Sequence, residues 1–235
     1  MILEVSDLHA GYIRGASVLK GVGMSIRAGE RVAVMGRNGM GKTLLVKTLM
    51  GIVRPSSGSI RFDGTRIDGL PTHRISNLGI AYVPQGREIF ADFTVLDNLR
   101  MGVIGKPHLR QAGFERVYEW FPILAERRHQ RAGTMSGGQM QQLAIARALV
   151  GRPKLLLLDE PSEGIQPSIV HEIAITLRRI CAEEALTVIL IEQNSEMVER
   201  LSERVAFIEK GRIAAEVGVS ALAEDETLIE RYLGV

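Results

Sequence analysis

The sequence predicts an α/β fold with a mainly parallel sheet, an antiparallel β subdomain at the N-terminal end and an inserted helical subdomain. Three observations lead to this prediction. Strand and helix patterns alternate from residue 154 to residue 209, which is typical of a parallel sheet with helices on its faces. Residues 31–35 form an apolar strand that runs straight into a glycine-rich loop and a helix. Between residues 86 and 150 the pattern is helical, with no strong strand.

The elements before the insertion are short, and glycine or proline separates them. Alternating or apolar segments predict strands at residues 2–5, 18–26, 31–35, 58–62 and 80–83. A helix is expected over 43–50, because Gly51 stands where helices commonly end. Asp63 and Gly64 are typical of a tight turn after a strand, and Pro84 stops the last strand.

The rest of the chain is expected to complete one domain, residues 1–235. Pro107 and Pro122 predict breaks in the helical insertion. After the insertion we expect strands 154–159, 187–191 and 204–209 and helices 168–183 and 195–201. The predicted organisation is an α/β core with its β subdomain at 1–85 and 151–217, the insertion at 86–150 and a short helical tail at 218–235.

Composition indicates a soluble globular protein. The net charge is only +2, from 29 basic and 27 acidic residues, so bulk electrostatics give no argument for nucleic acid as a partner. Cys181 is the one cysteine, which fits a reducing cytosol. The N-terminus has no secretory signal pattern, and the apolar stretches 155–158 and 187–191 are far shorter than the ~20 residues that span a bilayer. Any membrane role is therefore expected to depend on a partner chain.

The glycine-rich loop carries the strongest chemical signal. It matches G-x-x-x-x-G-K-[ST] and has a strand before it and a helix after it, which is the context that a phosphate-binding loop requires. Its glycines let backbone N–H groups converge on phosphate oxygens, and the helix N-terminus adds positive potential. Lys42 is expected on the β- and γ-phosphates, and the Thr43 hydroxyl on Mg²⁺. The predicted loop residues are Gly36, Arg37, Asn38, Gly39, Met40, Gly41, Lys42 and Thr43.

Two carboxylates follow an apolar strand. Residues 155–158 are four leucines, and Asp159 and Glu160 come directly after them. Asp159 is expected to hold Mg²⁺ through water, and Glu160 to polarise the attacking water. Alternatively, Asp159 only caps a following helix, since Pro161 comes soon after it.

A second glycine-rich segment opens the helical stretch 139–150. Serine is a favourable helix N-cap residue, and capping alone would explain a serine at position 136. It would not explain Gly137 and Gly138, because adjacent glycines weaken a helix start by roughly 1 kcal/mol each relative to alanine. Close approach of a phosphate to bare backbone would explain both glycines. Ser136, Gly137, Gly138 and Gln139 are therefore the expected second phosphate contact.

These segments, in this order, resemble the ATP-binding-cassette (ABC) transporter ATPases over essentially the whole chain. The resemblance implies a P-loop NTPase core and two cassettes that dimerise head to tail. ATP would lie between residues 36–43 of one chain and the Ser136–Gln139 segment of the other. Tyr12 matches the aromatic residue on which adenine stacks, although it could also be a surface loop aromatic. Gln85 matches the glutamine that senses Mg²⁺ and relays its state to the membrane partner.

Within the family, the chain is similar to the cassettes for urea or short amides and to those for branched-chain amino acids. Residues 86–90, 155–161 and 163–169 resemble the urea group, and residues 131–138 and 192–194 also resemble the amino-acid group. Residues 85–90 and 163–169 favour urea or a short amide as the solute.

Three positions depart from the family pattern. Leu44 stands where a second hydroxyl residue usually binds the α-phosphate, so Leu44→Thr is expected to tighten nucleotide binding. Gln193 occupies the usual place of a histidine on the γ-phosphate and cannot titrate near neutrality. Gln166 replaces an aspartate that reaches the partner chain. Leu44 is nevertheless expected among the ATP-binding residues. The expected catalytic residues are Glu160, Lys42 and Gln193.

The resemblance implies the ATPase subunit of an importer for a small polar solute. Its cofactors would be ATP and Mg²⁺. Its partners would be a second cassette, identical or different, two transmembrane permease subunits and, indirectly, an extracytoplasmic solute-binding protein. The chain would lie on the cytoplasmic face of the plasma membrane. The alternatives are a soluble cassette without a transport role and a nucleotide-binding module with low turnover.

Three other features have simpler interpretations. Residues 127–131 are basic, but a solvated helix end accounts for them better than a nucleic-acid site, because no aromatic residues are interleaved. Trp120 is expected in the core. Ile89, Phe90 and Phe93 either pack the helical subdomain or line a groove for a helix of the membrane partner.

Overall fold

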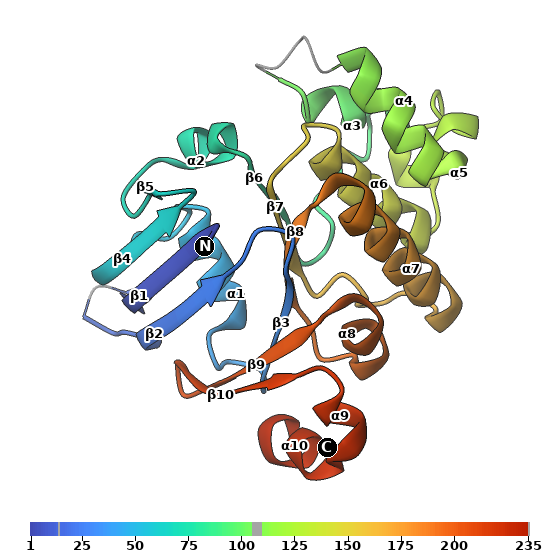
Figure 1. Cartoon of the computed structure of the whole chain (residues 1–235). Coiled ribbons are helices and arrows are strands. Elements are labelled where there is room, and N and C mark those ends of the chain that lie inside the picture. The colour runs from blue at the N-terminus through green and yellow to red at the C-terminus, as the bar shows by residue number, and fades with distance from the viewer. Residues whose placement is uncertain (14, 105–109, 235) are drawn as a thin grey trace.

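Two β-sheets and a group of inserted helices make up the computed structural model, which describes residues 1–13, 15–104 and 110–234. Figure 1 shows the smaller sheet at the left, the inserted helices at the upper right and the C-terminal helices at the bottom. The smaller sheet is antiparallel, with strand order β2-β1-β4-β5. Its strands are β1 Leu3–Ala10, β2 Leu19–Ile26, β4 Ser57–Phe62 and β5 Thr65–Arg66.

The larger sheet has six strands in the order β10-β9-β3-β8-β7-β6. All neighbouring pairs from β9 to β6 are parallel, and only β10 pairs antiparallel at the edge. The mainly parallel sheet of the sequence prediction is confirmed. Its strands are β3 Arg31–Met35, β6 Ile80–Val83, β7 Leu155–Asp159, β8 Thr187–Ile191, β9 Arg204–Glu209 and β10 Arg212–Gly218.

Alternation along the buried strands divides the core into two layers. Leu155 and Leu157 of β7 pack with α1 and the antiparallel sheet. Leu156 and Leu158 point to the opposite face, where they pack with the later helices. Because side chains alternate along a strand, a continuous apolar run is what a sheet covered on both faces requires.

Helices cover both faces of this sheet. The helix α1 after the glycine loop lies between the two sheets, and α7 and α8 cover the other face (Figure 1). The C-terminal helices lie beyond β10, where Tyr232 stacks on Phe207 of β9 with ring centroids 4.4 Å apart. These helices are α1 Lys42–Leu49, α2 Thr72–Leu78, α7 Pro167–Glu184, α8 Ser195–Leu201, α9 Ala221–Glu224 and α10 Glu226–Leu233.

The segment between β6 and β7 is helical in its described part. It contains α3 Val95–Met101, α4 Arg110–Trp120, α5 Pro122–Glu126, a 3₁₀ turn at Ala132–Thr134 and α6 Gly137–Leu149. Pro122 separates two helices by starting α5, a position where proline fits because the first turn needs no N–H partner. The break expected at Pro107 lies outside the described residues. Trp120 is in the core, as expected, with 7% of its surface exposed.

Three elements lie outside the predicted strands and helices. They are the edge strand β10 Arg212–Gly218, the short strand β5 Thr65–Arg66 and the helix α2 Thr72–Leu78. In α2 only Ile75 is buried, so the helix gives almost no apolar periodicity. Among the described residues, no helix is both long and apolar enough to cross a membrane.

Candidate functional site

The glycine loop joins β3 to α1 at the carboxyl edge of the parallel sheet. A side chain on Gly36 would come within 2.4 Å of the Ile208 carbonyl oxygen, so the loop can pass β9 only without one. Gly41 has φ 104°, a left-handed conformation, and a Cβ there would lie 2.8 Å from Leu19 Cδ2. Gly39 also has φ 80°, but the space around it is open. The loop thus packs tightly against the core on one side and faces open space at Gly39.

Lys42 begins α1 and turns its ammonium back into the loop. Its Nζ donates to the carbonyl oxygens of Gly36 at 2.6 Å and Arg37 at 3.3 Å. The side chain is 4% exposed, and burial lowers the pKa of Lys42, while the charges of Glu160 and Asp159 raise it. The ammonium is therefore poorly solvated and already aimed into the loop, where an anionic ligand would stabilise it.

Asp159 at the end of β7 lies against Thr43. The Thr43 hydroxyl donates to Asp159 Oδ1 at 3.1 Å, and the Tyr82 hydroxyl donates to Asp159 Oδ2 at 3.0 Å. Burial raises the pKa of Asp159, and the hydrogen bonds from Tyr82 and Thr43 only partly offset it. A buried carboxylate beside a hydroxyl is a natural place for a divalent cation, whose charge would reverse this shift.

Glu160 occupies the first position after β7 and is held by two glutamines. Its Oε2 accepts from Gln85 Nε2 at 3.1 Å, and its Oε1 accepts from Gln193 Nε2 at 3.1 Å. Gln193 Nε2 also donates to Asn38 Oδ1 at 2.9 Å. The backbone of Glu160 is left-handed, with φ 47°, and such strain is typical of functional sites. Residues from three separate segments thus meet at one carboxylate, and Gln193 connects them to Asn38 of the phosphate loop.

Most of the predicted nucleotide residues line one cavity of about 440 Å³. Tyr12 is 62% exposed at its rim, so its ring is free to stack on a planar ligand. Leu44 also lines it but is only 2% exposed and belongs to the core around α1. The predicted residues that line this cavity are Tyr12, Asn38, Gly39, Gly41, Lys42, Thr43, Leu44, Gln85 and Glu160.

The remaining loop residues stand behind the cavity. Gly36 and Arg37 offer the two carbonyl oxygens that hold Lys42. The sulfur of Met40 accepts the backbone N–H of Lys210 at 3.3 Å, which ties the loop to the turn after β9. Asp159 joins the site through Thr43 and Tyr82.

The Ser136 segment does not line this cavity. Ser136 and Gln139 form a capping box: Gln139 N–H donates to Ser136 Oγ at 3.4 Å, and Ser136 N–H donates to Gln139 Oε1 at 3.1 Å. A Cβ on Gly138 would lie 2.6 Å from Ile169 Cγ2, so packing on α7 already explains this glycine. A Cβ on Gly137 would meet Arg87 at an ordinary 3.5 Å, so packing does not explain this glycine. Close approach of a ligand could therefore explain only Gly137.

Sequence reasoning missed two functional residues. Tyr82 was given no role, yet it holds Asp159. Glu192 is 3% exposed, and its carboxylate accepts from Ser162 N–H at 2.9 Å and from Gln193 N–H at 2.7 Å. It therefore connects the loop after Glu160 with the loop that carries Gln193. A carboxylate directly after the apolar strand β8 was the signal that could have revealed it.

Comparisons with known proteins give the family. The family model described as ABC transporter matches residues 19–163. The high-affinity branched-chain amino acid transport ATP-binding protein BraG of Pseudomonas aeruginosa is 42% identical over 229 residues, which are 97% of this chain and 98% of that protein. The probable branched-chain amino acid transport ATP-binding protein LivF of Archaeoglobus fulgidus is 32% identical, over 100% of this chain and 99% of the relative. Neither name mentions urea, so these relatives do not support the expected preference for urea.

Solved structures confirm the predicted fold. An ATP-binding cassette of an ABC transporter in its ADP conformation matches with a TM-score of 0.86 at 25% identity, and 97% of each chain is covered. The cassette cbiO1 from Clostridium perfringens, part of the transporter complex cbiONQ, matches with a TM-score of 0.85 at 28% identity, over 98% of this chain and 93% of that one. The chain thus belongs to the ABC transporter family, as one of its ATP-binding and ATP-hydrolysing cassettes.

Proposed function

We propose that this chain is the ATPase subunit of an importer for branched-chain amino acids. One observation carries the ATPase chemistry: Lys42, Thr43, Asp159 and Glu160 meet at the open side of the phosphate loop. The similarity to BraG over 97% of the chain supports the importer and its solute. Branched-chain amino acids thus replace urea, the solute favoured by the sequence alone, as the proposed solute.

In this mechanism the loop binds the triphosphate of ATP. Lys42 would exchange its bonds to the Gly36 and Arg37 carbonyls for phosphate oxygens. Gly39 has no side chain of its own and open space beside it, so its backbone N–H could approach a phosphate closely. Tyr12 would stack on the adenine.

The residues beside Asp159 fit Mg²⁺. A hydroxyl from Thr43, a carboxylate from Asp159 and the side-chain amide oxygen of Gln85 form the all-oxygen set that this ion prefers. When bound, Mg²⁺ neutralises charge that develops on the β- and γ-phosphates. Tyr82 keeps the Asp159 carboxylate in place from the other side.

Glu160 is the proposed base for the attacking water. It would accept a proton as the water oxygen bonds to the γ-phosphorus and the bond to the β-γ bridging oxygen breaks, which leaves ADP and inorganic phosphate. Gln85 and Gln193 each donate a hydrogen bond to one of its two carboxylate oxygens. These bonds would fix the orientation in which the carboxylate accepts the proton from water. Gln193 also donates to Asn38 of the phosphate loop, and this contact supports a role for Gln193 beside the γ-phosphate.

A second cassette is proposed to complete the site. The cavity is open, and the Ser136–Gln139 segment lies outside it, with Gly137 facing only Arg87. In a head-to-tail dimer the Ser136 segment of one chain would cover the phosphates bound by the other. The helix start at Gly137 offers free N–H groups and positive potential for this contact.

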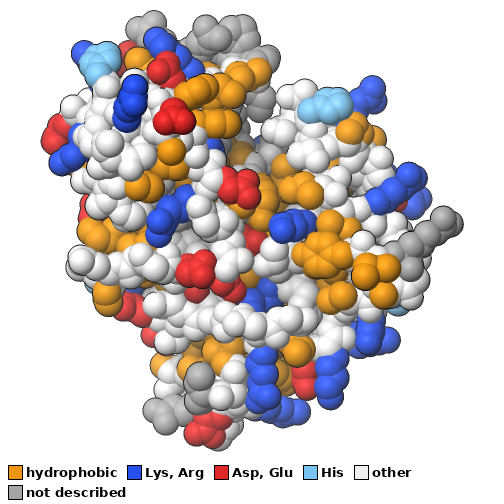
Figure 2. Space-filling view, turned by 180° about the vertical axis from the view of Figure 1, so that it is seen from behind, with side chains coloured by type: hydrophobic (Ala, Val, Ile, Leu, Met, Phe, Trp, Pro, Cys, Tyr) orange, Lys and Arg blue, Asp and Glu red, His pale blue; other side chains and the backbone are white. Residues whose placement is uncertain are grey.

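The permease partners are proposed to dock in the groove beside α2. This groove has a volume of about 860 Å³, and its lining includes Ile52, Phe90 and Ile104, which are 51%, 42% and 63% exposed. Figure 2, seen from behind, shows hydrophobic side chains gathered along a hollow between the two upper lobes of the molecule. Exposed apolar clusters of this kind mark protein contacts. Such docking would hold the chain on the cytoplasmic face of the plasma membrane, with a solute-binding protein on the far side.

Uptake by cells tests the solute. Deleting the gene should abolish uptake of labelled leucine and leave uptake of labelled urea unchanged. A plasmid copy of the parent gene should restore leucine uptake, and a Lys42→Ala copy should not. Loss of urea uptake with intact leucine uptake would overturn the proposed solute.

Calorimetry with MgATP tests the nucleotide site. Lys42→Ala should weaken binding at least about tenfold, because the buried ammonium in the loop makes charge-assisted contacts to phosphate worth more than ~1.4 kcal/mol. Lys20→Ala is the matched control, since Lys20 is an exposed lysine of β2 outside the cavity. Equal affinity for the parent and Lys42→Ala would rule out the loop as the triphosphate site.

A further inference from the structure

A second cavity lies at the opposite edge of the parallel sheet from the nucleotide site. Its lining includes residues that precede strands: Ala28 lies three residues before the start of β3, and Lys154 and Leu186 lie directly before β7 and β8. Because these strands are parallel, their amino ends share one edge, and the phosphate loop and Glu160 lie at the other. The cavity is thus separate from the ATP chemistry.

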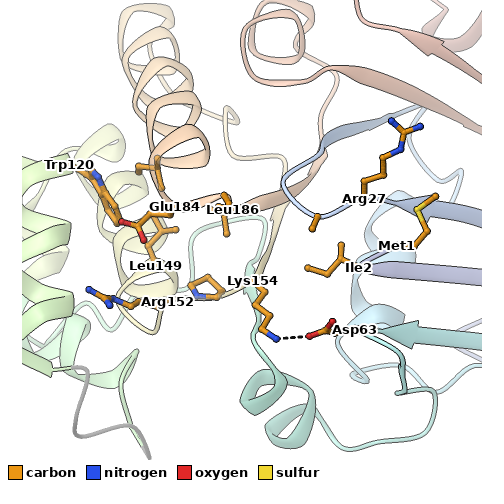
Figure 3. A pocket seen from close by; sticks show the side chains of 14 residues that line it. Met1, Ile2, Arg27, Asp63, Trp120, Leu149, Arg152, Lys154, Glu184 and Leu186 are labelled. Carbon is orange, nitrogen blue, oxygen red and sulfur yellow. Dashed lines mark hydrogen bonds and ion pairs between the residues drawn. The ribbon is translucent and has the colours of Figure 1, made fainter.

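The cavity has a volume of about 520 Å³, within the range of small-molecule sites. Figure 3 shows the side chains that border it, with Trp120 and Leu149 on one side, Ile2 on the other and Leu186 between them. These side chains come from the inserted helices, the antiparallel sheet and the core. An apolar body would therefore contact all three parts of the molecule.

The charges at its rim are unevenly paired. Lys154 Nζ is 2.6 Å from Asp63 Oδ2, so these two neutralise each other. Glu184 Oε1 is 2.9 Å from Arg116 Nε and is likewise paired. These pairs leave two other charged side chains of the lining, Arg27 and Arg152.

The guanidinium groups of Arg27 and Arg152 form no hydrogen bond or ion pair with the described part of the chain. The nearest acid in sequence to Arg27 is Glu30, which accepts the backbone N–H of Arg27 at 2.8 Å and acts on the guanidinium only through a longer-range electrostatic attraction, without an ion pair. Both arginines are exposed at the cavity rim. Apolar walls with two unpaired cations favour a ligand that is apolar at one end and anionic at the other.

We propose that this cavity is a second ligand site, which binds a small amphiphilic anion with an apolar body and one carboxylate. The apolar body would lie against Trp120, Leu149 and Leu186, and the carboxylate would pair with Arg27 or Arg152. A ligand in this place would contact both the inserted helices and the N-terminal end of the antiparallel sheet.

Trp120 supplies the measurement, because it is the one tryptophan of the chain. The probe is sodium octanoate, titrated into the full-length protein while tryptophan emission is recorded and binding is checked by calorimetry. We expect a saturable change in emission and weaker binding of 1-octanol, which has the same chain length without the charge. The Lys42→Ala protein should bind octanoate like the parent, which separates this site from the nucleotide site.

Variants locate the ligand. At least one of Arg27→Ala and Arg152→Ala should weaken octanoate binding about three- to tenfold, the loss of one partly exposed ion pair or charge-assisted hydrogen bond. Arg178→Ala, which removes an exposed arginine outside the cavity, should leave it unchanged. Ala28→Phe should abolish binding by filling the cavity while keeping both charges.

Three results would overturn the proposal. One is no saturable response in the parent protein by either method. Another is equal affinity for octanoate and 1-octanol, which would mean that the two arginines do not select an anion. The third is unchanged octanoate binding by the folded Ala28→Phe protein, since the ligand would then lie elsewhere.

Discussion

Leu44 is the residue at which the demands of the site and of the core meet. It lines the nucleotide cavity, but it is 2% exposed and packs in the core that joins α1 to the antiparallel sheet. Leucine in place of the hydroxyl residue usual in the family therefore fits the apolar packing around this position. Because Leu44 is buried, any gain in nucleotide binding by Leu44→Thr would come with a loss of core packing.

We predict that Leu44→Thr destabilises the protein by about 2–3 kcal/mol, because it removes buried methyl groups and places a hydroxyl in an apolar layer. Urea unfolding of the nucleotide-free protein measures this loss. Leu44→Met, which roughly conserves volume, should cost less than about 1.5 kcal/mol. Unchanged stability of Leu44→Thr together with tighter ATP binding would contradict the packing role.

The site residues that sequence could reveal are those whose chemistry is local. Lys42 and Thr43 follow their glycines directly, and Asp159 and Glu160 follow their strand directly. Tyr82 could not be found in the same way. Its hydroxyl reaches Asp159 only because β6 pairs with β7, a contact between residues far apart in the chain.

At the scale of elements, the segment between β6 and α3 is held in a strained form by α6. Arg87 and Glu88 have φ 71° and 45°, a left-handed conformation that costs roughly 1–2 kcal/mol per non-glycine residue. Arg147 of α6 donates through Nη2 to the Glu88 carbonyl at 2.8 Å and to the Arg87 carbonyl at 3.3 Å. Its guanidinium also lies 5.3 Å from the centroid of the Phe90 ring. Burial lowers the pKa of Arg147, so these contacts replace its lost hydration.

We predict that Arg147→Lys releases this segment without unfolding the chain, because an ammonium cannot bond both carbonyls and stack on Phe90. Hydrogen exchange of the amides at 86–90 should accelerate by about tenfold or more, as expected when ~1.4 kcal/mol of local stability is lost. Exchange in β3 and β8 should not change. Arg131→Lys, at an exposed arginine before α6, is the control. Equal protection of 86–90 in both variants would show that α6 does not hold the segment.

A second prediction at this scale concerns the junction of the two sheets. Arg204 at the start of β9 donates to Glu30 Oε1 at 2.9 Å and to the Ser25 carbonyl at 2.9 Å, and it also pairs with Glu216 of β10. Burial raises the pKa of Glu30, but the bonds from Arg204 and from the Arg27 backbone outweigh it and lower the pKa overall. A lowered folded-state pKa means that Glu30 stabilises the protein above its ordinary pKa and ceases to do so as pH falls through the lowered value.

Arg204→Met should therefore cost about 2–3 kcal/mol of unfolding free energy at pH 7, and less as the pH falls through the acid range. Urea unfolding of the parent and the variant between pH 7 and pH 3 measures both effects. Arg178→Met serves as the exposed control. A stability difference that is the same at every pH would show that Glu30 is not the partner that matters.

The strands that could be predicted are those buried on both faces of the sheet, because such strands appear in the sequence as continuous apolar runs. The bounds of β3, β6, β8 and β9 agree with the expected ranges because each is a short apolar run between breaks. The edge strand β10 alternates between exposed and half-buried positions and has no apolar run. Its position depends on antiparallel pairing with β9, which no local signal encodes.

At the scale of the whole molecule, the two proposed halves of the nucleotide site do not meet within one chain. The Glu160 carboxylate borders the open cavity, while the Ser136–Gln139 segment lies outside it. In a symmetric dimer, the Ser136–Gln139 segment of each chain would close the cavity of the other chain. Two complete nucleotide sites would form, and no cavity or Ser136 segment would lack its counterpart. The state of the nucleotide would then govern association, because ATP supplies contacts to both chains.

Glu160→Gln tests this arrangement. The variant keeps the size of the side chain and can still bond to Gln85 or Gln193, so ATP binding should persist. Hydrolysis should slow by on the order of 10²–10⁴, the usual contribution of a positioned base. With the nucleotide uncleaved, an ATP-bound dimer should accumulate, which light scattering during size-exclusion chromatography in MgATP would detect. Glu163→Gln is the matched control, because Glu163 accepts from the same Gln85 amide at 3.1 Å without following β7. Near-parental turnover by Glu160→Gln would exclude it as the base, and an ATP-loaded variant that stays monomeric would exclude a site shared between two copies of this chain.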